Sequence, residues 1–254
     1  MKQPLPVNAA LFTTSWDDGH PLDFRIAGML SKYGLGGTFY APRTCHRQTM
    51  GPAQLRELAG RFEIGAHTLN HVKLTGVSDA AAEAEIRGSK RWVEEATGRR
   101  CEMFCYPGGL FRPAHQAMVR KAGFLGDRTV EFLSTKQPRR AGRFATLATS
   151  VQAYPHSGVD YLRNLLKRRR IGAVCGYPLH FSGKTWMELT DRLLVRAVRD
   201  GGVFHLWGHS WEVQEQGLWG ELDAVFKKMS GYRSAVRNVC NSEVCIWTNP
   251  EQMY

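Results

Sequence analysis

No run of the sequence reaches the roughly 18 consecutive apolar residues that a membrane-spanning helix needs. The opening residues, MKQPLPVNAALFTTSW, lack the basic segment and the following apolar segment of a secretory signal peptide. Repeats, low-complexity tracts and Pro- or Ser-rich linkers are also missing, so nothing marks a domain boundary. These absences predict a single domain over residues 1–254 and a cytoplasmic location.

Cysteine is scarce and irregularly spaced. The closer cysteines form C-x-x-x-C and C-x-x-x-x-C pairs, whereas structural zinc sites usually have tighter spacing and paired knuckles. We therefore expect reduced thiols, in keeping with a cytoplasmic protein. The six cysteines are Cys45, Cys101, Cys105, Cys175, Cys240 and Cys245.

Acidic residues are too few to balance the basic ones, and the net charge is +11. Such a charge favours acidic partners, but the basic residues are scattered and match no nucleic-acid-binding motif, so we expect no nucleic-acid partner. The densest basic run, residues 167–170, ends an expected helix over residues 158–170 with an apolar stripe. That helix permits peripheral membrane contact. Alternatively, its cations complement the helix dipole and face solvent.

The rest of the composition is that of a folded protein, with 43% hydrophobic and 22% charged residues. Short β-rich runs alternate with helical patterns along the chain. The expected strands are 11–16, 37–41, 63–67, 103–107, 125–129, 145–151, 203–209 and 243–247. The expected helices are 21–33, 52–61, 78–97, 113–122, 158–170, 185–200 and 217–230. This alternation predicts a β/α barrel or a doubly wound parallel sheet.

Two adjacent carboxylates, Asp17 and Asp18, end the first expected strand, where β/α folds gather active-site residues. On a regular strand their side chains would point to opposite faces. Gly19 would let the chain turn, so that both carboxylates could approach one site. The alternative is structural, because Asp-Asp-Gly is also a common turn sequence.

Two histidines, His67 and His71, follow the third expected strand at a spacing of four residues. A helical turn there would place both imidazoles on one side, where a carboxylate could complete a zinc-type ligand set. By itself this spacing also arises by chance on polar helices. The pair Asp17 and Asp18 supplies the missing acidic ligand.

A third polar cluster lies on the expected strand 203–209. The two-residue period of a strand puts His205, Trp207 and His209 on one face, with His209 at the carboxyl end. A histidine in that position is a candidate general acid or base. We interpret the deeper His205 as a hydrogen-bonded interior residue.

Taken in order, TSWDDGH, HTLNH, FCYPGG and a strand ending in histidine resemble the motifs of the polysaccharide deacetylases, carbohydrate esterase family four. The similarity runs from about residue 11 to 250. It implies an α/β fold made of a single distorted (β/α) barrel with about seven parallel strands. It also implies a metal-dependent hydrolase that removes an N-acetyl or similar acyl group from an amino sugar.

The same resemblance implies roles for the clustered side chains. Asp18, His67 and His71 would hold one divalent metal ion, most commonly zinc, and Asp17 would act as the general base. His209 would protonate the departing amine as the general acid.

Two further residues are candidates for binding the substrate. The resemblance implies that a backbone N–H of the FCYPGG turn, expected at Gly108, stabilises the oxyanion. Trp207, Trp211 and Trp219 each offer a flat apolar face suited to a sugar ring, and we take Trp211 as the candidate. Buried aromatic residues also belong to hydrophobic cores in many proteins.

The chain departs from the family pattern in two places. Many members have an arginine where this chain has Cys105, and we expect Arg128 to replace it as the partner of the catalytic aspartate. The alternative is that Arg128 lies on the surface and pairs with Asp127. The general acid also lacks an obvious acidic partner, for which Glu212 and Asp160 are both candidates.

We expect an amino-sugar substrate that is nucleotide-linked, lipid-linked or an oligosaccharide, and a role in O-antigen or other surface-glycan biosynthesis. The expected location and the positive charge favour this class. The alternatives are a deformylase or another amidohydrolase on a non-polymeric N-acyl substrate, or a glycan-binding relative without activity. The sequence gives no indication of the oligomeric state.

Overall fold

The computed structural model describes residues 9–157, 159 and 186–248. Within them, ten strands form one sheet whose pairs are parallel except for β6 with β7. The strands are β1 (Ala10–Trp16), β2 (Thr38–Ala41), β3 (Glu63–Ala66), β4 (Met103–Cys105), β5 (Gly126–Arg128), β6 (Arg139–Ala141), β7 (Phe144–Leu147), β8 (Val151–Gln152), β9 (Val203–Gly208) and β10 (Val236–Asn238).

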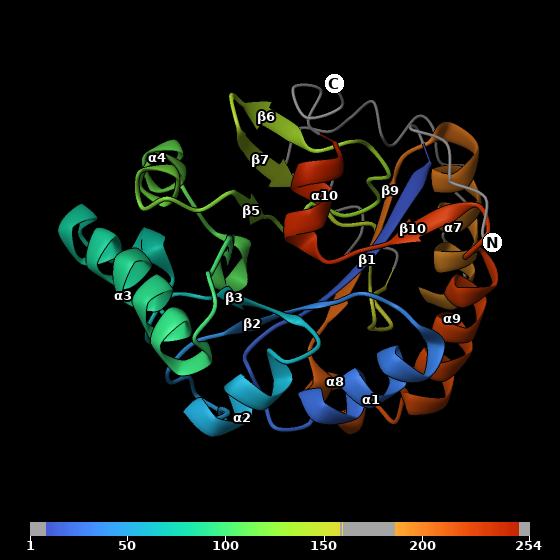
Figure 1. Cartoon of the computed structure of the whole chain (residues 1–254), viewed down its shortest axis with the longest axis horizontal. Helices are drawn as coiled ribbons and strands as arrows, with labels where there is room; N and C mark the ends of the chain where they lie inside the picture. Colours follow the sequence, from blue (N-terminus) through green and yellow to red (C-terminus); the bar gives the residue numbers. More distant parts are fainter. Residues whose placement is uncertain (1–8, 158, 160–185, 249–254) are drawn as a thin grey trace.

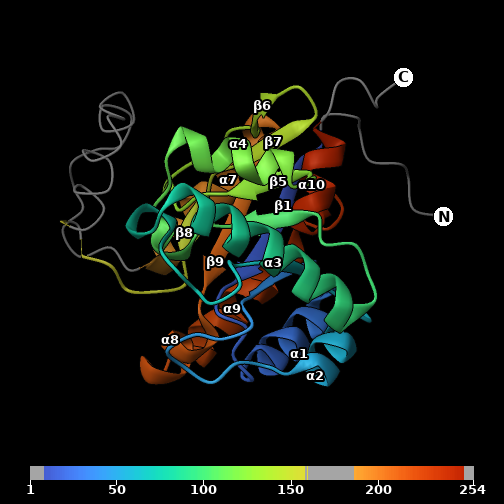
Figure 2. The ribbon, with the colours of Figure 1, turned by 90° about the vertical axis from the view of Figure 1, so that its left-hand side faces the viewer.

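Helices surround this sheet (Figures 1 and 2), and none of those in the described residues is long and apolar enough to cross a membrane. The α-helices are α1 (Asp23–Tyr33), α2 (Pro52–Leu58), α3 (Asp79–Thr97), α4 (Pro113–Lys121), α7 (Trp186–Asp200), α8 (Ser210–Glu215), α9 (Trp219–Gly231) and α10 (Asn241–Trp247). Two short 3-10 helices, η1 (Leu74–Gly76) and η2 (Pro107–Gly109), lie in loops. The predicted helix 158–170, with its basic run, lies outside the described residues.

The sheet curls into a distorted barrel that one stretch of chain, residues 144–152, closes. Its first part, β7, pairs with β5, and its last part, β8, pairs with β9. Between them, the N–H of Ser150 donates to the carbonyl oxygen of His205 on β9 at 2.9 Å. The ring is therefore β1, β2, β3, β4, β5, the segment 144–152 and β9. The predicted barrel of about seven parallel strands is confirmed.

Both faces of the sheet are buried, which explains the nearly continuous apolar runs of the strands. On the outer face, Phe12 of β1 packs in the same core as Ile26 and Leu30 of α1. On the inner face, Leu11 packs with Tyr40 and other side chains of the barrel interior. This alternation along β1 places successive side chains outside and inside the barrel, as the two-residue period requires.

The predicted strand 243–247 is wrong, because these residues belong to α10. The carboxylate of Glu243 accepts a hydrogen bond from the N–H of Cys240 at 2.8 Å, which starts a helix in the manner of a capping box. A short apolar run does not by itself distinguish a strand from a buried helix. The last parallel strand is β10, which precedes α10, pairs with β1 and was missed together with β6 and α8.

Helix α10 closes the amino end of the barrel through Asn241. The side chain of Asn241 accepts a hydrogen bond from the hydroxyl of Thr13 and donates one to the hydroxyl of Tyr40, each at 2.9 Å. Its backbone N–H donates to the hydroxyl of Thr38, also at 2.9 Å. All four residues are buried.

We predict that Asn241→Leu lowers the free energy of unfolding by about 2–4 kcal/mol, because it leaves the buried hydroxyls of Thr13 and Tyr40 without this partner, at a cost of about 1–3 kcal/mol each. Chemical denaturation measures the change. The matched variant Gln216→Leu, at an exposed position, should stay within about 0.5 kcal/mol of wild type. Equal stability of Asn241→Leu and Gln216→Leu would contradict the assignment.

Candidate active site

The three polar clusters predicted from the sequence meet at the carboxyl end of the barrel. Asp17 and Asp18 directly follow β1, and His67 directly follows β3. Arg128 is the last residue of β5, and His209 directly follows β9. Since the carboxyl ends of parallel strands lie at one end of a barrel, these side chains share one site.

The backbone after β1 turns in the way that brings both carboxylates to this site. Asp18 has φ 76° and Gly19 has φ 59°, so the extended conformation of β1 ends at the aspartate pair. The left-handed conformation is unusual for a residue with a side chain and carries a conformational cost. The predicted turn at Gly19 is therefore present, and it begins one residue earlier, at Asp18.

Asp18, His67 and His71 form a cluster of three potential metal ligands. Oδ1 of Asp18 lies 3.0 Å from Nε2 of His71 and 3.6 Å from Nε2 of His67. The helical turn predicted for residues 67–71 is wrong, since this segment is a loop with positive φ at Thr68 and His71. The spacing of four residues thus brings the imidazoles together through a loop, with ring centroids 5.0 Å apart.

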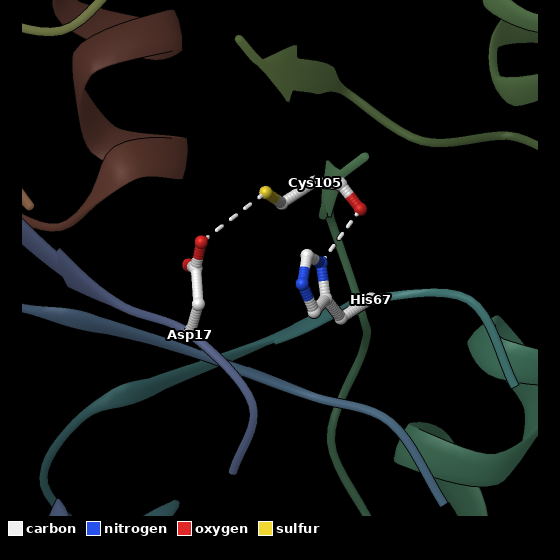
Figure 3. Close-up of side chains that lie close together, drawn as sticks. All are labelled: Asp17, His67 and Cys105. Atoms are coloured by element: carbon white, nitrogen blue, oxygen red, sulfur yellow. Dashed lines mark hydrogen bonds between the residues drawn. The ribbon is translucent and has the colours of Figure 1, made fainter. Parts of the chain in front are cut away.

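The tautomer of His67 shows that this cluster fits a cation. Nδ1 of His67 lies 2.9 Å from the carbonyl oxygen of Cys105, an acceptor, so Nδ1 carries the proton (Figure 3). Burial lowers the pKa of His67 to about 4, so the ring is neutral and Nε2 bears a lone pair. That lone pair faces Oδ1 of Asp18, which is buried and has no hydrogen-bond partner among the described residues. A cation bound by both acceptors would remove their repulsion, and histidine ligands commonly hydrogen-bond in this way.

Trp211 orients the carboxylate of Asp18. Its indole N–H donates to Oδ2 of Asp18 at 3.0 Å, which leaves Oδ1 directed at the two histidines. The guanidinium of Arg47 lies over the ring of Trp211, 3.7 Å from the centroid. The structure therefore places the predicted substrate-binding residue at the site, with its N–H on a candidate metal ligand and a cation on its ring.

Asp17 forms a buried ion pair with Arg128. The guanidinium donates to Oδ1 of Asp17, and the side chain of Arg128 is fully buried. The rings of Tyr40 and Trp207 lie 5.2 Å and 4.8 Å from the guanidinium carbon, so aromatic faces surround the cation. On the other carboxylate oxygen, Oδ2, the thiol of Cys105 approaches to 3.9 Å (Figure 3).

The alternative position for Arg128, on the surface beside Asp127, is wrong. Adjacent residues of a strand point to opposite faces, and Asp127 is directed away from Arg128. Its carboxylate accepts hydrogen bonds from the hydroxyl of Tyr106 at 2.6 Å and from the amide of Gln116 at 3.0 Å.

The charges of the site oppose the effect of burial on both aspartates. Burial alone would raise the pKa of Asp17, but the positive charges of Arg128 and His209 lower it overall. Burial likewise raises the pKa of Asp18. The surrounding histidines lower it by more, so this pKa also falls below its ordinary value. Both carboxylates are therefore ionised at neutral pH.

His209 has the opposite electrostatic setting. Burial would lower its pKa, but the hydrogen bond to Glu212 and the charge of Asp17 raise the pKa to about 9. Nδ1 of His209 lies 2.6 Å from Oε2 of Glu212. Of the two candidate acidic partners, Glu212 occupies this position, and Asp160 lies outside the described residues.

His205 is the hydrogen-bonded interior residue that was predicted. Nδ1 lies 3.1 Å from the carbonyl oxygen of Ala148, and Nε2 lies 2.8 Å from the hydroxyl of Ser15. Burial and the charge of Arg128 lower the pKa of His205 to about 3, so it stays neutral. A ring that stays neutral in this way is not a general acid at neutral pH.

Gly108 lies in the turn η2 directly after β4 and has φ 65°. It is exposed, and the side chain of Lys73 passes the open side of its backbone. The ring of Trp219, by contrast, lies 4.0 Å from the guanidinium carbon of Arg25, and its N–H donates to Gln214. These contacts use the ring face and the N–H that a substrate would need.

Residues 6–126 match the family model described as polysaccharide deacetylase. This part of the chain is similar to the polysaccharide deacetylase family. The match contains β1 through β4, with the aspartate pair, both metal-site histidines and the FCYPGG turn.

A curated deacetylase relative is YxkH of Bacillus subtilis (strain 168), provisionally named a polysaccharide deacetylase. It is 24% identical over 114 residues, and the matched region spans 43% of this chain and 41% of that relative. The chain thus aligns with less than half of the length of the curated relative it matches.

The fold of the deacetylase family extends over the whole chain. A crystal structure from Mycobacterium smegmatis, provisionally described as a polysaccharide deacetylase, has a TM-score of 0.72 and 16% identity, covering 100% of this chain and 95% of that one. BA3943, described as a CE4 family pseudoenzyme from Bacillus anthracis, has a TM-score of 0.53 and 15% identity, covering 94% of this chain and 66% of that one. At these identities the likeness concerns the fold alone.

Sequence reasoning missed two neighbours of this candidate site, His46 and Arg47. The exposed ring of His46 lies 5.7 Å from that of His71 and 6.5 Å from that of Trp211. Both belong to a loop between β2 and α2 with no strand end or motif to mark it. No pattern in the sequence signals their proximity, because it depends on the path of that loop.

We predict that the purified protein binds about one divalent ion per chain and that the double variant His67→Ala, His71→Ala loses it, because only the carboxylate of Asp18 remains. Elemental analysis measures the ratio. Asp17→Asn is the matched control and should keep the ion, since all three candidate ligands are intact. Equal metal content in the double variant and wild type would refute the ligand set.

Proposed function

We propose that the protein is a metal-dependent hydrolase that removes an N-acetyl or similar N-acyl group from an amino sugar. One observation carries the proposal. A candidate metal site at Asp18 lies beside an ionised carboxylate, Asp17, and a histidine, His209, that its acidic neighbours Glu212 and Asp17 keep protonated. General base, metal and general acid are the three groups that metal-assisted hydrolysis of an amide uses.

The metal is held in this proposal by Asp18, His67 and His71, and zinc is the ion that two histidines and one carboxylate fit best. When bound, such an ion supplies a water whose pKa it lowers to about 7 and polarises the acyl carbonyl. Hydrogen bonds from Trp211 to Asp18 and from His67 to the carbonyl of Cys105 keep the ligands in place.

Asp17 acts as the general base in this mechanism and takes the proton that the attacking water loses. Its low pKa keeps it ionised in the free enzyme, and the ion pair with Arg128 fixes Oδ1. The other oxygen, Oδ2, contacts the thiol of Cys105 only weakly, at 3.9 Å. That oxygen is the one we expect to receive the proton.

His209 delivers a proton to the nitrogen that leaves. An amide nitrogen departs poorly as an anion, so a positioned acid accelerates this step, by about 10²–10⁴-fold in typical enzymes. Glu212 binds Nδ1 of His209 and thereby directs Nε2–H toward the substrate. The backbone N–H of Gly108, in the exposed turn after β4, is the proposed donor to the oxyanion.

We propose a substrate of the nucleotide-linked, lipid-linked or oligosaccharide class, used in surface-glycan biosynthesis in the cytoplasm. The net charge of +11 suits a substrate with phosphate or carboxylate groups. Contact with a membrane surface through residues 158–170 would bring a lipid-linked sugar to the site.

Two alternatives differ in their chemistry. The fold also occurs in a protein described as a pseudoenzyme, so the fold alone does not imply activity. The opposed electrostatic settings of Asp17 and His209 favour an enzyme. A deformylase or an amidohydrolase for a non-sugar substrate would use the same groups on a different acyl compound.

A panel of substrates tests the proposal directly. The metal-loaded protein is incubated with N-acetyl and N-formyl amino sugars, their nucleotide-linked forms, oligosaccharides and simple N-acyl amides, and mass spectrometry follows the loss of the acyl group. Loss of acetyl from an amino sugar, abolished in Asp17→Asn, is the expected result. Turnover confined to formyl or non-sugar amides, or no turnover at all, would reject the proposal.

We predict that Arg128→Ala lowers turnover by at least ~10-fold without loss of metal, since a charge-assisted contact is worth about 1.4 kcal/mol or more. The variant leaves the buried Asp17 without its counter-charge, so its pKa rises and it ceases to be an effective base near neutral pH. Steady-state rates and elemental analysis measure the two effects. Arg87→Ala, which removes an exposed ion pair with Glu83, is the control and should keep wild-type rates.

We predict a bell-shaped pH profile of kcat/KM. Protonated His209 is the active form, so activity falls as pH rises through its pKa of about 9, or somewhat lower because a bound cation repels it. The acid limb follows protonation of Asp17 and the groups coupled to it. Glu212→Gln removes the partner that raises the pKa of His209, so the alkaline limb should move to lower pH. An unchanged limb would show that His209 is not the acid.

A further inference from the structure

A glutamine outside every predicted motif, Gln152 of β8, is connected to the proposed general acid. Its side-chain Nε2 donates to Oε2 of Glu212 at 2.9 Å, and its Oε1 lies 2.7 Å from Nε2 of His156. The same Oε2 of Glu212 also lies 2.6 Å from Nδ1 of His209. Four side chains from β8, the loop after it, the end of β9 and α8 therefore form one unbroken series of hydrogen bonds.

The direction of every bond in this series follows from the chemistry of its members. An ionised carboxylate only accepts, so both His209 and Gln152 must donate to Glu212. The amide group of Gln152 is thereby oriented with its oxygen toward His156. An amide oxygen also only accepts, so Nε2 of His156 must carry a proton.

Burial makes these hydrogen bonds costly to lose. Gln152 is 5% exposed, and the side chains of His209 and Glu212 are each 17% exposed. A buried amide that lost either partner would retain an unpaired polar group, which costs about 1–3 kcal/mol. The amide therefore restrains the carboxylate of Glu212 from one side while His209 binds it from the other.

We propose that Gln152 is a positioning residue of the general acid: it holds Glu212 in the orientation that directs Nε2 of His209 at the leaving nitrogen. Without Gln152, the carboxylate is free to rotate about its side-chain torsions and can leave Nδ1 of His209. His156 fixes the orientation of the amide in turn, through its Nε2–H. This inference rests on the proposed function and adds to it a residue that acts through Glu212 and does not touch the substrate.

The test compares Gln152→Leu with Gln116→Leu. Gln116 is a matched control, because its amide also donates two hydrogen bonds, to Asp127 at 3.0 Å and to Thr146 at 2.8 Å, on the opposite face of the sheet from the site. Each variant is assayed on an N-acetyl amino sugar and on an activated acetyl ester, whose leaving group needs no proton.

For Gln152→Leu we expect kcat on the amide to fall at least ~10-fold with KM unchanged, while the ester rate stays within about 3-fold of wild type. Gln116→Leu should change both substrates by the same factor. Equal losses on amide and ester in Gln152→Leu, or wild-type rates on both, would overturn the proposal. A KM effect confined to the amide would also overturn it, since that result indicates substrate binding.

A second measurement needs no turnover and so separates this inference from the proposed function. Nitrogen-15 NMR of the metal-loaded protein reports the tautomers of His156 and His209. Wild type should show a proton on Nε2 of His156, and Gln152→Leu should lose that preference, whereas Gln116→Leu should keep it. If wild type shows no deacetylase activity, the proposed function fails, but the NMR result still tests the hydrogen-bond directions. An unprotonated Nε2 of His156 in wild type would refute those directions.

Discussion

The buried ion pair between Asp17 and Arg128 is the constraint on which the rest of the site depends. A carboxylate and a guanidinium in a nearly dry interior persist as charges only because each compensates the other. The aromatic faces of Tyr40 and Trp207 occupy the remaining space around the cation. The barrel interior must therefore hold both an apolar core and the charged pair at its carboxyl end. The alternation of side chains along β1 and β5 directs Asp17 and Arg128 inward.

The surroundings of Asp17 and His209 shift the pKa values of these two groups in opposite directions. Asp17 is kept ionised by a cation, and His209 is kept protonated by the carboxylate of Glu212. Each therefore holds at neutral pH the protonation state that its proposed role requires. The same separation cannot arise from burial alone, because burial acts against both charged forms.

The sequence predicts the parts of the site that follow strand ends, since strand periodicity and turn residues are local. Asp17, Asp18, His67 and His209 were found in this way, and the barrel followed from the strand–helix alternation. Local patterns fail where the outcome depends on distant contacts. The loop that joins His67 to His71, the helical state of residues 241–247 and the choice of Glu212 each depend on packing. Gln152 had no signal at all, because its link to the site runs through Glu212, which is 60 residues away.

Closure of the amino end of the barrel by α10 affects how the chain folds. Thr13 and its partner Asn241 are separated by 228 positions, and β10 pairs with β1 across a similar distance. Contacts between such remote segments require closure of a very large loop, which slows folding. The interior of the barrel stays accessible to water until residue 241 has been synthesised. During translation, the first half of the protein therefore exposes apolar strand faces that a chaperone can recognise.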